Sequence, residues 1–121
     1  MNITTDTTRF ENLPEASRQT VEKKLAPVGR LLGEEEAAAL LSIELEPAPA
    51  EGRSATPVKL VANLSVGREV FHAEAVKPTP ESAADRVRRT LEAEIRKVRG
   101  REHGLWKRGS ERLKGMLRFG R

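Results

Sequence analysis

The chain has 121 residues, of which 37% are hydrophobic and 33% charged, and its formal net charge is +4 at pH 7. This length supports one domain with a modest core, and the composition is typical of a soluble globular protein. The sequence contains no cysteine, which excludes a disulfide framework, a thiolate zinc cluster and a thiol nucleophile.

The opening segment, MNITTDTTRF, has neither the basic end nor the apolar core of a signal peptide. No apolar run in the sequence approaches the roughly 20 residues that span a bilayer. The sequence therefore predicts a cytoplasmic protein with no membrane partner.

The first third of the chain predicts a short strand followed by a helix. Residues 2–5 are β-prone, and Asn12 is expected to cap a helix whose first turn holds Pro14 and Glu15, as in a capping box. One stripe at helical spacing should face a core: Ser17, Val21, Leu25, Val28 and Leu32.

Two residues limit this helix. Pro27 lacks an amide hydrogen and clashes with the preceding turn, so the helix should kink or end near Ala26, and Gly33 should stop it. The acidic run at 34–36 is expected to be a solvated loop, with a short helical turn through 37–39 as the alternative.

The middle of the chain predicts three strands. Residues 42–46 alternate between apolar and polar side chains. After the long loop at 47–57, the segment 58–66 shows the same alternation over a longer stretch. The segment 67–69 then predicts a hairpin turn, in which Gly67 can take a positive φ. Residues 70–76 return as an antiparallel strand.

The last long helix begins after Thr79, which is a good N-cap, with Pro80 at its first position. Gly100 is expected to loosen its end. Its buried stripe is Ala84, Val87, Leu91, Ile95 and Val98.

The resulting order, β-α-β-β-β-α, predicts an α+β two-layer sandwich: a mainly antiparallel four-stranded sheet with two helices packed on one face. Residues 1–103 should form this domain and residues 104–121 a basic C-terminal tail. Within the tail, Ser110 could cap a last short helix. We favour a frayed tail that orders on a polyanion, with docking to a membrane surface or a partner groove as the alternative.

Basic residues are concentrated at the C-terminal end. From Arg96 onward there are ten Lys or Arg and two acidic residues, a net charge of +8, whereas the first 95 residues carry a net charge of −4. A basic face this dense typically serves a polyanion, because each neutralised phosphate releases condensed counterions. The alternative interpretation is a solvated charged helix.

At 100° per residue, several cations lie opposite the buried stripe of the last helix: Arg86, Arg89, Arg96 and Lys97. Arg88 and Arg99 flank that face. On the first helix, Lys23 and Arg30 point outward, with Arg18 and Lys24 on the shoulders. Since both helices must cover one sheet face, their outer surfaces should form a shared basic ridge that binds phosphate without reading bases.

Other functions have little support in the sequence. The four aromatic residues, Phe10, Phe71, Trp106 and Phe119, avoid the exposed faces of the expected strands, so base stacking on a sheet is disfavoured. His72 and His103 have no partner at metal-ligand spacing.

The acidic residues Glu44, Glu46 and Glu74 should share the open sheet face as solvated charges, and no nucleotide-binding glycine motif occurs. We therefore expect a non-enzyme with no metal, no cofactor and no small-molecule substrate.

Short motifs, in this order and spacing, resemble one family. The segments FHAEA at 71–75, ESAAD at 81–85 and LEAEIRK at 91–97 resemble the LHAE, DMYAAID and LERQIRKYK segments of the ribosome hibernation promoting factors, also described as ribosome-associated inhibitor A or the sigma-54 modulation protein family. RFE at 9–11 and VEKKL at 21–25 are similar to the family's HFE and EKKL. This chain has Glu81 at a position where the family usually has an aromatic residue.

The resemblance covers residues 1–101 and is to the short form, which lacks the long form's dimerisation domain. It implies a β-α-β-β-β-α fold and a protein that binds the small ribosomal subunit, with its 16S-type rRNA, in the channel of transfer and messenger RNA. Such proteins silence translation when growth stops and protect idle ribosomes. We also expect a monomer away from the ribosome.

By this resemblance and the geometry of the ridge, the expected ribosome-binding residues are Lys23, Lys24, Arg30, Arg86, Arg89, Arg96, Lys97, Arg99 and Arg101, with tail contacts from Trp106, Lys107 and Arg108. The sequence leaves two alternatives open. One is a general protein for structured RNA or RNA chaperoning that acts by shape. The other is a docking module whose functional part is the tail.

Overall fold

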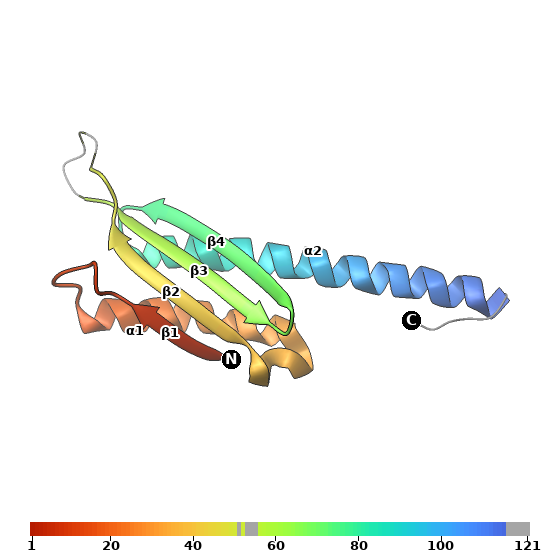
Figure 1. The fold of residues 1–121 in the computed structure, drawn as a ribbon. Helices are drawn as coiled ribbons and strands as arrows, with labels where there is room; N and C mark the ends of the chain where they lie inside the picture. The colour runs from red at the N-terminus through yellow and green to blue at the C-terminus, as the bar shows by residue number, and fades with distance from the viewer. Residues whose placement is uncertain (51, 53–55, 116–121) are drawn as a thin grey trace.

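The computed structural model describes residues 1–50, 52 and 56–115, and of residues 101–115 it describes the backbone alone. The elements follow one another in the order drawn in Figure 1. They are β1 (Asn2–Asp6), α1 (Glu15–Leu25), the 3-10 helix η1 (Ala26–Ala38), β2 (Leu40–Pro47), β3 (Val58–Val66), β4 (Glu69–Lys77) and α2 (Pro80–Gly115).

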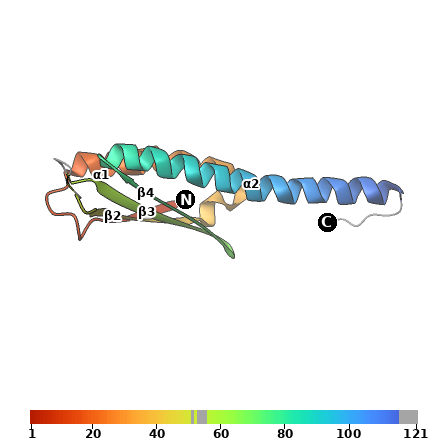
Figure 2. The same ribbon diagram turned by 90° about the horizontal axis from the view of Figure 1, so that it is seen from above.

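The four strands form one sheet in the order β1-β2-β3-β4. β1 pairs with β2 in parallel, and the other two pairings are antiparallel. Both helices lie over the same face of the sheet, which leaves the other face open (Figure 2). The predicted α+β two-layer fold is therefore confirmed.

The hairpin between β3 and β4 turns at two residues, since Val66 pairs directly with Glu69. Gly67 has a φ of 60°, and Arg68, which follows it, does not have a positive φ. A positive φ at the first central residue alone is the pattern of a type II′ turn, which suits the twist of the two strands and favours glycine.

The core forms where the sheet meets the helices. β3 alternates strictly between buried and half-buried residues, as a strand covered on one face must. The predicted stripe on α2 is confirmed: Ala84, Val87, Leu91 and Ile95 are at most 1% exposed, and Val98 packs at the edge of the core.

The predicted start of the first helix is wrong. α1 begins at Glu15, Pro14 occupies the N-cap position, and no side chain caps the helix. Asn12 has a φ of 61°, in the left-handed region, so the chain is still turning there. The backbone carbonyl of Pro14 accepts hydrogen bonds from the amides of Ser17 and Arg18, at 3.0 and 3.3 Å.

The predicted end of this helix is confirmed. α1 stops at Leu25, and the chain continues as η1, which contains Pro27 and is broken at Gly33 by a φ of 59° and a ψ of −128°. The expectation of a solvated loop at 34–36 is wrong, because η1 runs through this acidic segment to Ala38. The helical turn, the alternative, is what forms.

The N-terminus of α2 is as predicted. The Thr79 hydroxyl accepts a hydrogen bond from the Ser82 amide at 3.1 Å, and the helix starts at Pro80. Its end is not as predicted, because α2 runs without a break past Gly100 and Ser110 to Gly115 and extends beyond the sheet (Figure 1). A helical glycine costs only about 1 kcal/mol relative to alanine, so it does not by itself end a helix.

The separate helix expected at Ser110 is therefore wrong, since that residue lies inside α2. The division at residue 103 between a ribosome-binding domain and a tail concerns function and stays a prediction. No helix in the described part of the chain has the length and apolarity needed to cross a membrane.

Candidate nucleic-acid interface

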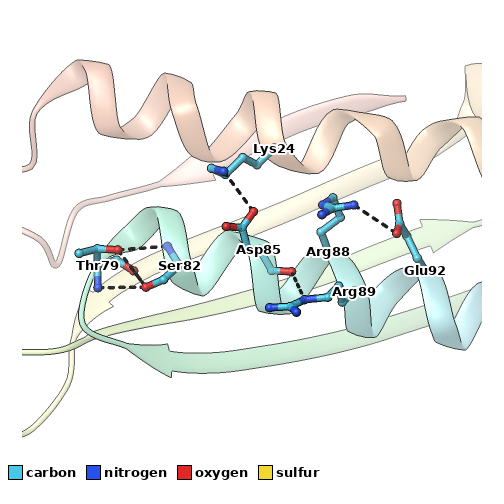
Figure 3. A network of polar contacts seen from close by, with 7 residues as sticks. All are labelled: Lys24, Thr79, Ser82, Asp85, Arg88, Arg89 and Glu92. Carbon is cyan, nitrogen blue, oxygen red and sulfur yellow. Dashed lines mark hydrogen bonds and ion pairs between the residues drawn. The ribbon is translucent and has the colours of Figure 1, made fainter.

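The two helices are joined by an ion pair at their outer surface. The Lys24 ammonium lies 3.1 Å from an Asp85 carboxylate oxygen, and both side chains are partly exposed (Figure 3). Sequence reasoning missed this contact because its partners are 61 residues apart and share no local pattern. Lys24 is thus placed where predicted, but a carboxylate already faces its charge.

The outer face of α2 carries the predicted cations. Arg86, Arg89, Arg96 and Lys97 are all exposed, on the side of the helix opposite the buried Leu91. The Arg89 Nε donates to the backbone carbonyl of Asp85 at 3.4 Å, and this neutral acceptor does not cancel the charge of the guanidinium (Figure 3). Among the described residues, none of these four cations forms an ion pair with a carboxylate.

The first helix and η1 contribute two further cations. Lys23 and Arg30 are exposed, and neither has a carboxylate partner within the described ranges. Below, the basic ridge denotes six exposed cations: Lys23, Arg30, Arg86, Arg89, Arg96 and Lys97. Their exposure confirms the predicted outward placement, and their binding role stays a prediction.

Other cations of the helices are neutralised within the fold. Arg18 pairs with Glu15 and, at 3.7 Å, with Glu22. The hydrogen bond with Glu15 raises the pKa of Arg18 above its ordinary value, and the same contact lowers the pKa of Glu15. Arg88 lies 3.4 Å from Glu92, the intrahelical partner expected from their spacing (Figure 3).

Arg99 differs most from its expected role. Its guanidinium lies 2.7 Å from Glu35 of η1 and 3.2 Å from Glu69 of β4, and the side chain is 29% exposed. The sequence suggested that Arg99 flanks the outer face of the helix. In the structure, Arg99 instead links α2 to η1 and to the start of β4 through these two ion pairs. Its role in ribosome binding stays a prediction.

Four residues of the predicted interface lie outside the side chains that the structure describes: Arg101, Trp106, Lys107 and Arg108. Their proposed contacts are untested.

The open face of the sheet carries acidic side chains, in contrast to the basic ridge. Glu44, Glu46 and Glu74 lie on it as predicted. The strand register places Val61 between Glu44 and Glu74, so those two carboxylates are not adjacent. Arg9 lies 2.9 Å from Glu46, and this contact raises the pKa of the arginine above its ordinary value.

The open face of the sheet also carries a histidine. His72 lies on it as predicted, with Nδ1 2.7 Å from Asn63 Oδ1 and Nε2 3.3 Å from a Glu74 oxygen. Among the described residues, no group of three or more acidic or histidine side chains is arranged to hold a metal ion. Phe71 is 6% exposed and Phe10 packs at the core, so neither offers a stacking platform to bases.

Solved structures with the same architecture are known. The N-terminal domain of protein Y from Thermus thermophilus matches with a TM-score of 0.64 and 23% identity, over 81% of this chain and 99% of that domain. The chain has the fold of that domain. A ribosomal subunit interface protein from Coxiella burnetii matches with a TM-score of 0.64 and 18% identity, over 83% of this chain and 99% of that one.

No protein-family model matches the sequence, and no curated protein matches it either. At these identities the likeness establishes the fold. It confirms the fold that the sequence resemblance implied.

Proposed function

We propose that this chain belongs to the hibernation promoting factors and is a ribosome-associated translation inhibitor. It binds the small ribosomal subunit in the channel for transfer and messenger RNA, and it keeps idle ribosomes intact in stationary phase or stress. The observation that carries this proposal is the basic ridge on the paired helices, in a fold shared with a protein named for the ribosomal subunit interface.

The ridge suits a folded RNA backbone. Arg86 and Lys97 are eleven residues apart on one helix, a span of roughly 16 Å at 1.5 Å per residue, so the ridge on α2 can follow several successive phosphates. Its cations are exposed and have no described carboxylate partner, so phosphate binding breaks no internal ion pair. Arginine and lysine at such positions fix the orientation of a protein on RNA without reading its sequence.

A second function uses the same ridge. Because phosphate contacts carry no base information, the protein could instead bind structured RNA in general or act as an RNA chaperone. Co-sedimentation with purified small subunits, with and without excess duplex RNA, separates the two functions. A ribosome factor remains on the subunit in the presence of the competitor, whereas a general RNA binder is displaced.

Binding should depend steeply on salt. With six cations contacting phosphates, the logarithm of the association constant should fall with the logarithm of salt concentration with a slope of about −5. Titrations of labelled protein against small subunits at several potassium chloride concentrations measure this slope. A slope near zero would show that the ridge is not the contact surface.

Removing residues 104–121 should weaken binding and leave the domain folded. The described core residues of α2 end at Val98, so this deletion removes none of them. We expect a melting temperature within a few degrees of that of the full chain and a faster dissociation from the subunit, because the deletion removes six basic side chains that can add contacts with RNA phosphates. Thermal melts and dissociation kinetics measure the two effects, and unfolding of the truncated chain would instead make residues 104–121 part of the fold.

A further inference from the structure

β4 is the last strand of the sheet, and in the described part of the chain its outer edge pairs with no other strand. It spans nine residues, and within the described part of the chain its only strand partner is β3. Two valines on the open face of β4 are unusually exposed, Val70 at 66% and Val76 at 48%. A long edge with exposed apolar side chains is a ready template for another strand.

The register shows which main-chain groups this edge offers. The pair that closes the two-residue turn, Val66 and Glu69, is hydrogen-bonded in a hairpin of this type, and such pairs alternate along an antiparallel ladder. The amides and carbonyls that point away from β3 therefore belong to every second residue: Val70, His72, Glu74 and Val76. These are also the residues whose side chains lie on the open face.

We infer that β4 pairs antiparallel with β4 of a second copy of this chain, with the two-fold axis at Ala73. In this register Val70 lies opposite Val76 of the partner and His72 opposite Glu74. Glu69 lies opposite Lys77 at the ends of the strands. Because each such pair occurs twice, the four outward-facing residues of each strand exchange about eight main-chain hydrogen bonds.

The sequence of β4 is complementary to itself in this register only. Valine lies opposite valine, histidine lies opposite a carboxylate, and the residues at the two ends of the strand have opposite charges. Each of these is a favourable cross-strand pair. Moving the axis to residue 74 places Glu74 opposite Glu74, and moving it to residue 75 places Glu74 opposite Val76. An isologous interface requires self-complementarity of this kind.

The pair would keep the basic ridge available. A two-fold axis at an antiparallel edge runs through the sheet from one face to the other, so both helical layers lie on the same side of an eight-stranded sheet. The outer face of α2 lies away from the sheet in each copy (Figure 2). The paired form therefore presents two basic ridges in one direction, in contrast to the monomer that the sequence alone favoured.

Sedimentation equilibrium of the purified protein tests the pairing. The mass should rise with concentration from 13.4 kDa towards twice that value. Val76→Lys should weaken association at least tenfold, because it sets a lysine against Val70 of the partner. The matched control is Leu40→Lys, since Leu40 is 41% exposed on the same open face but lies on β2, inside the sheet, and association should not change.

Disulfide cross-linking tests the register. The chain has no natural cysteine, so Ala73→Cys introduces a single thiol at the two-fold axis. Residues opposite each other in a non-hydrogen-bonded pair have Cα atoms about 4.5 Å apart, within the range that a disulfide requires. Ala75→Cys is the control, because the same register separates its two copies by four residues, or about 13 Å.

Oxidation should cross-link the Ala73→Cys variant and leave the Ala75→Cys variant monomeric in denaturing gels, with circular dichroism confirming that both variants fold. A mass of 13.4 kDa at every concentration would overturn the inference. So would a dimer that tolerates Val76→Lys, because its interface would lie elsewhere. Neither measurement contains ribosomes, so the outcome is independent of the proposed function.

Discussion

Replacing Arg89 and Arg96 together with glutamate is expected to abolish binding to the small ribosomal subunit. Both residues are exposed on the outer face of α2, and the double reversal changes the charge of the ridge by four units. Two phosphate contacts then become repulsions, so affinity should fall by at least about a hundredfold. Co-sedimentation with purified subunits at about 0.15 M salt, where the Debye length is about 8 Å, measures this loss.

The fold should survive this change, because exposed surface substitutions generally alter stability by about 0.5 kcal/mol or less each. A matched control reverses Arg68, in the β3–β4 turn, and Lys77, at the end of β4, which changes the charge equally outside the ridge. The control should bind within about threefold of the natural protein, since attraction between separated charges is largely screened by salt. Equal loss in both variants would show that net charge, and not the ridge, governs binding.

Leu91→Ala should be more destabilising than any of the surface substitutions above. Leu91 is fully buried at the centre of the α2 stripe, where the helix packs on the sheet. Truncation removes apolar contacts and leaves a cavity, which should lower the free energy of unfolding by about 2–5 kcal/mol. Urea denaturation followed by circular dichroism measures the change, and the denaturation midpoint should fall with little change in slope.

The same substitution at an exposed position is the control. Leu40 is 41% exposed on the open face, so Leu40→Ala should cost less than about 1 kcal/mol. If Leu91→Ala were equally mild, α2 would not be held on the sheet by its buried stripe. The predicted mode of binding, which relies on the outward face of that helix, would then lose its structural basis.

Most of the fold could be predicted from local patterns. The alternation in β3 and β4, the turn at Gly67 and the cap at Thr79 depend on residues close together in sequence, and the structure has all of them. Local reasoning failed at Asn12 and Gly100. Asparagine often caps the start of a helix and glycine often ends one, but the neighbouring structure decides whether either does so at a given position.

The candidate interface, like the fold, could be predicted from the sequence only in part. Helical periodicity placed six cations on the outside, and all six are exposed. The same periodicity could not show that Lys24 faces Asp85 or that Arg99 is held by Glu35 and Glu69. These contacts join residues from different elements, and no spacing in the sequence brings them together.

By itself, therefore, the sequence determined the identity and order of the main elements and the outward direction of the ridge, because periodic burial is a local property of a helix or strand. Only the tertiary structure decided which cations remain unpaired and which edge of the sheet remains open. Charge pairing depends on distances between segments, and the free edge of β4 depends on the order in which the strands assemble. Both follow from packing the whole chain around one core.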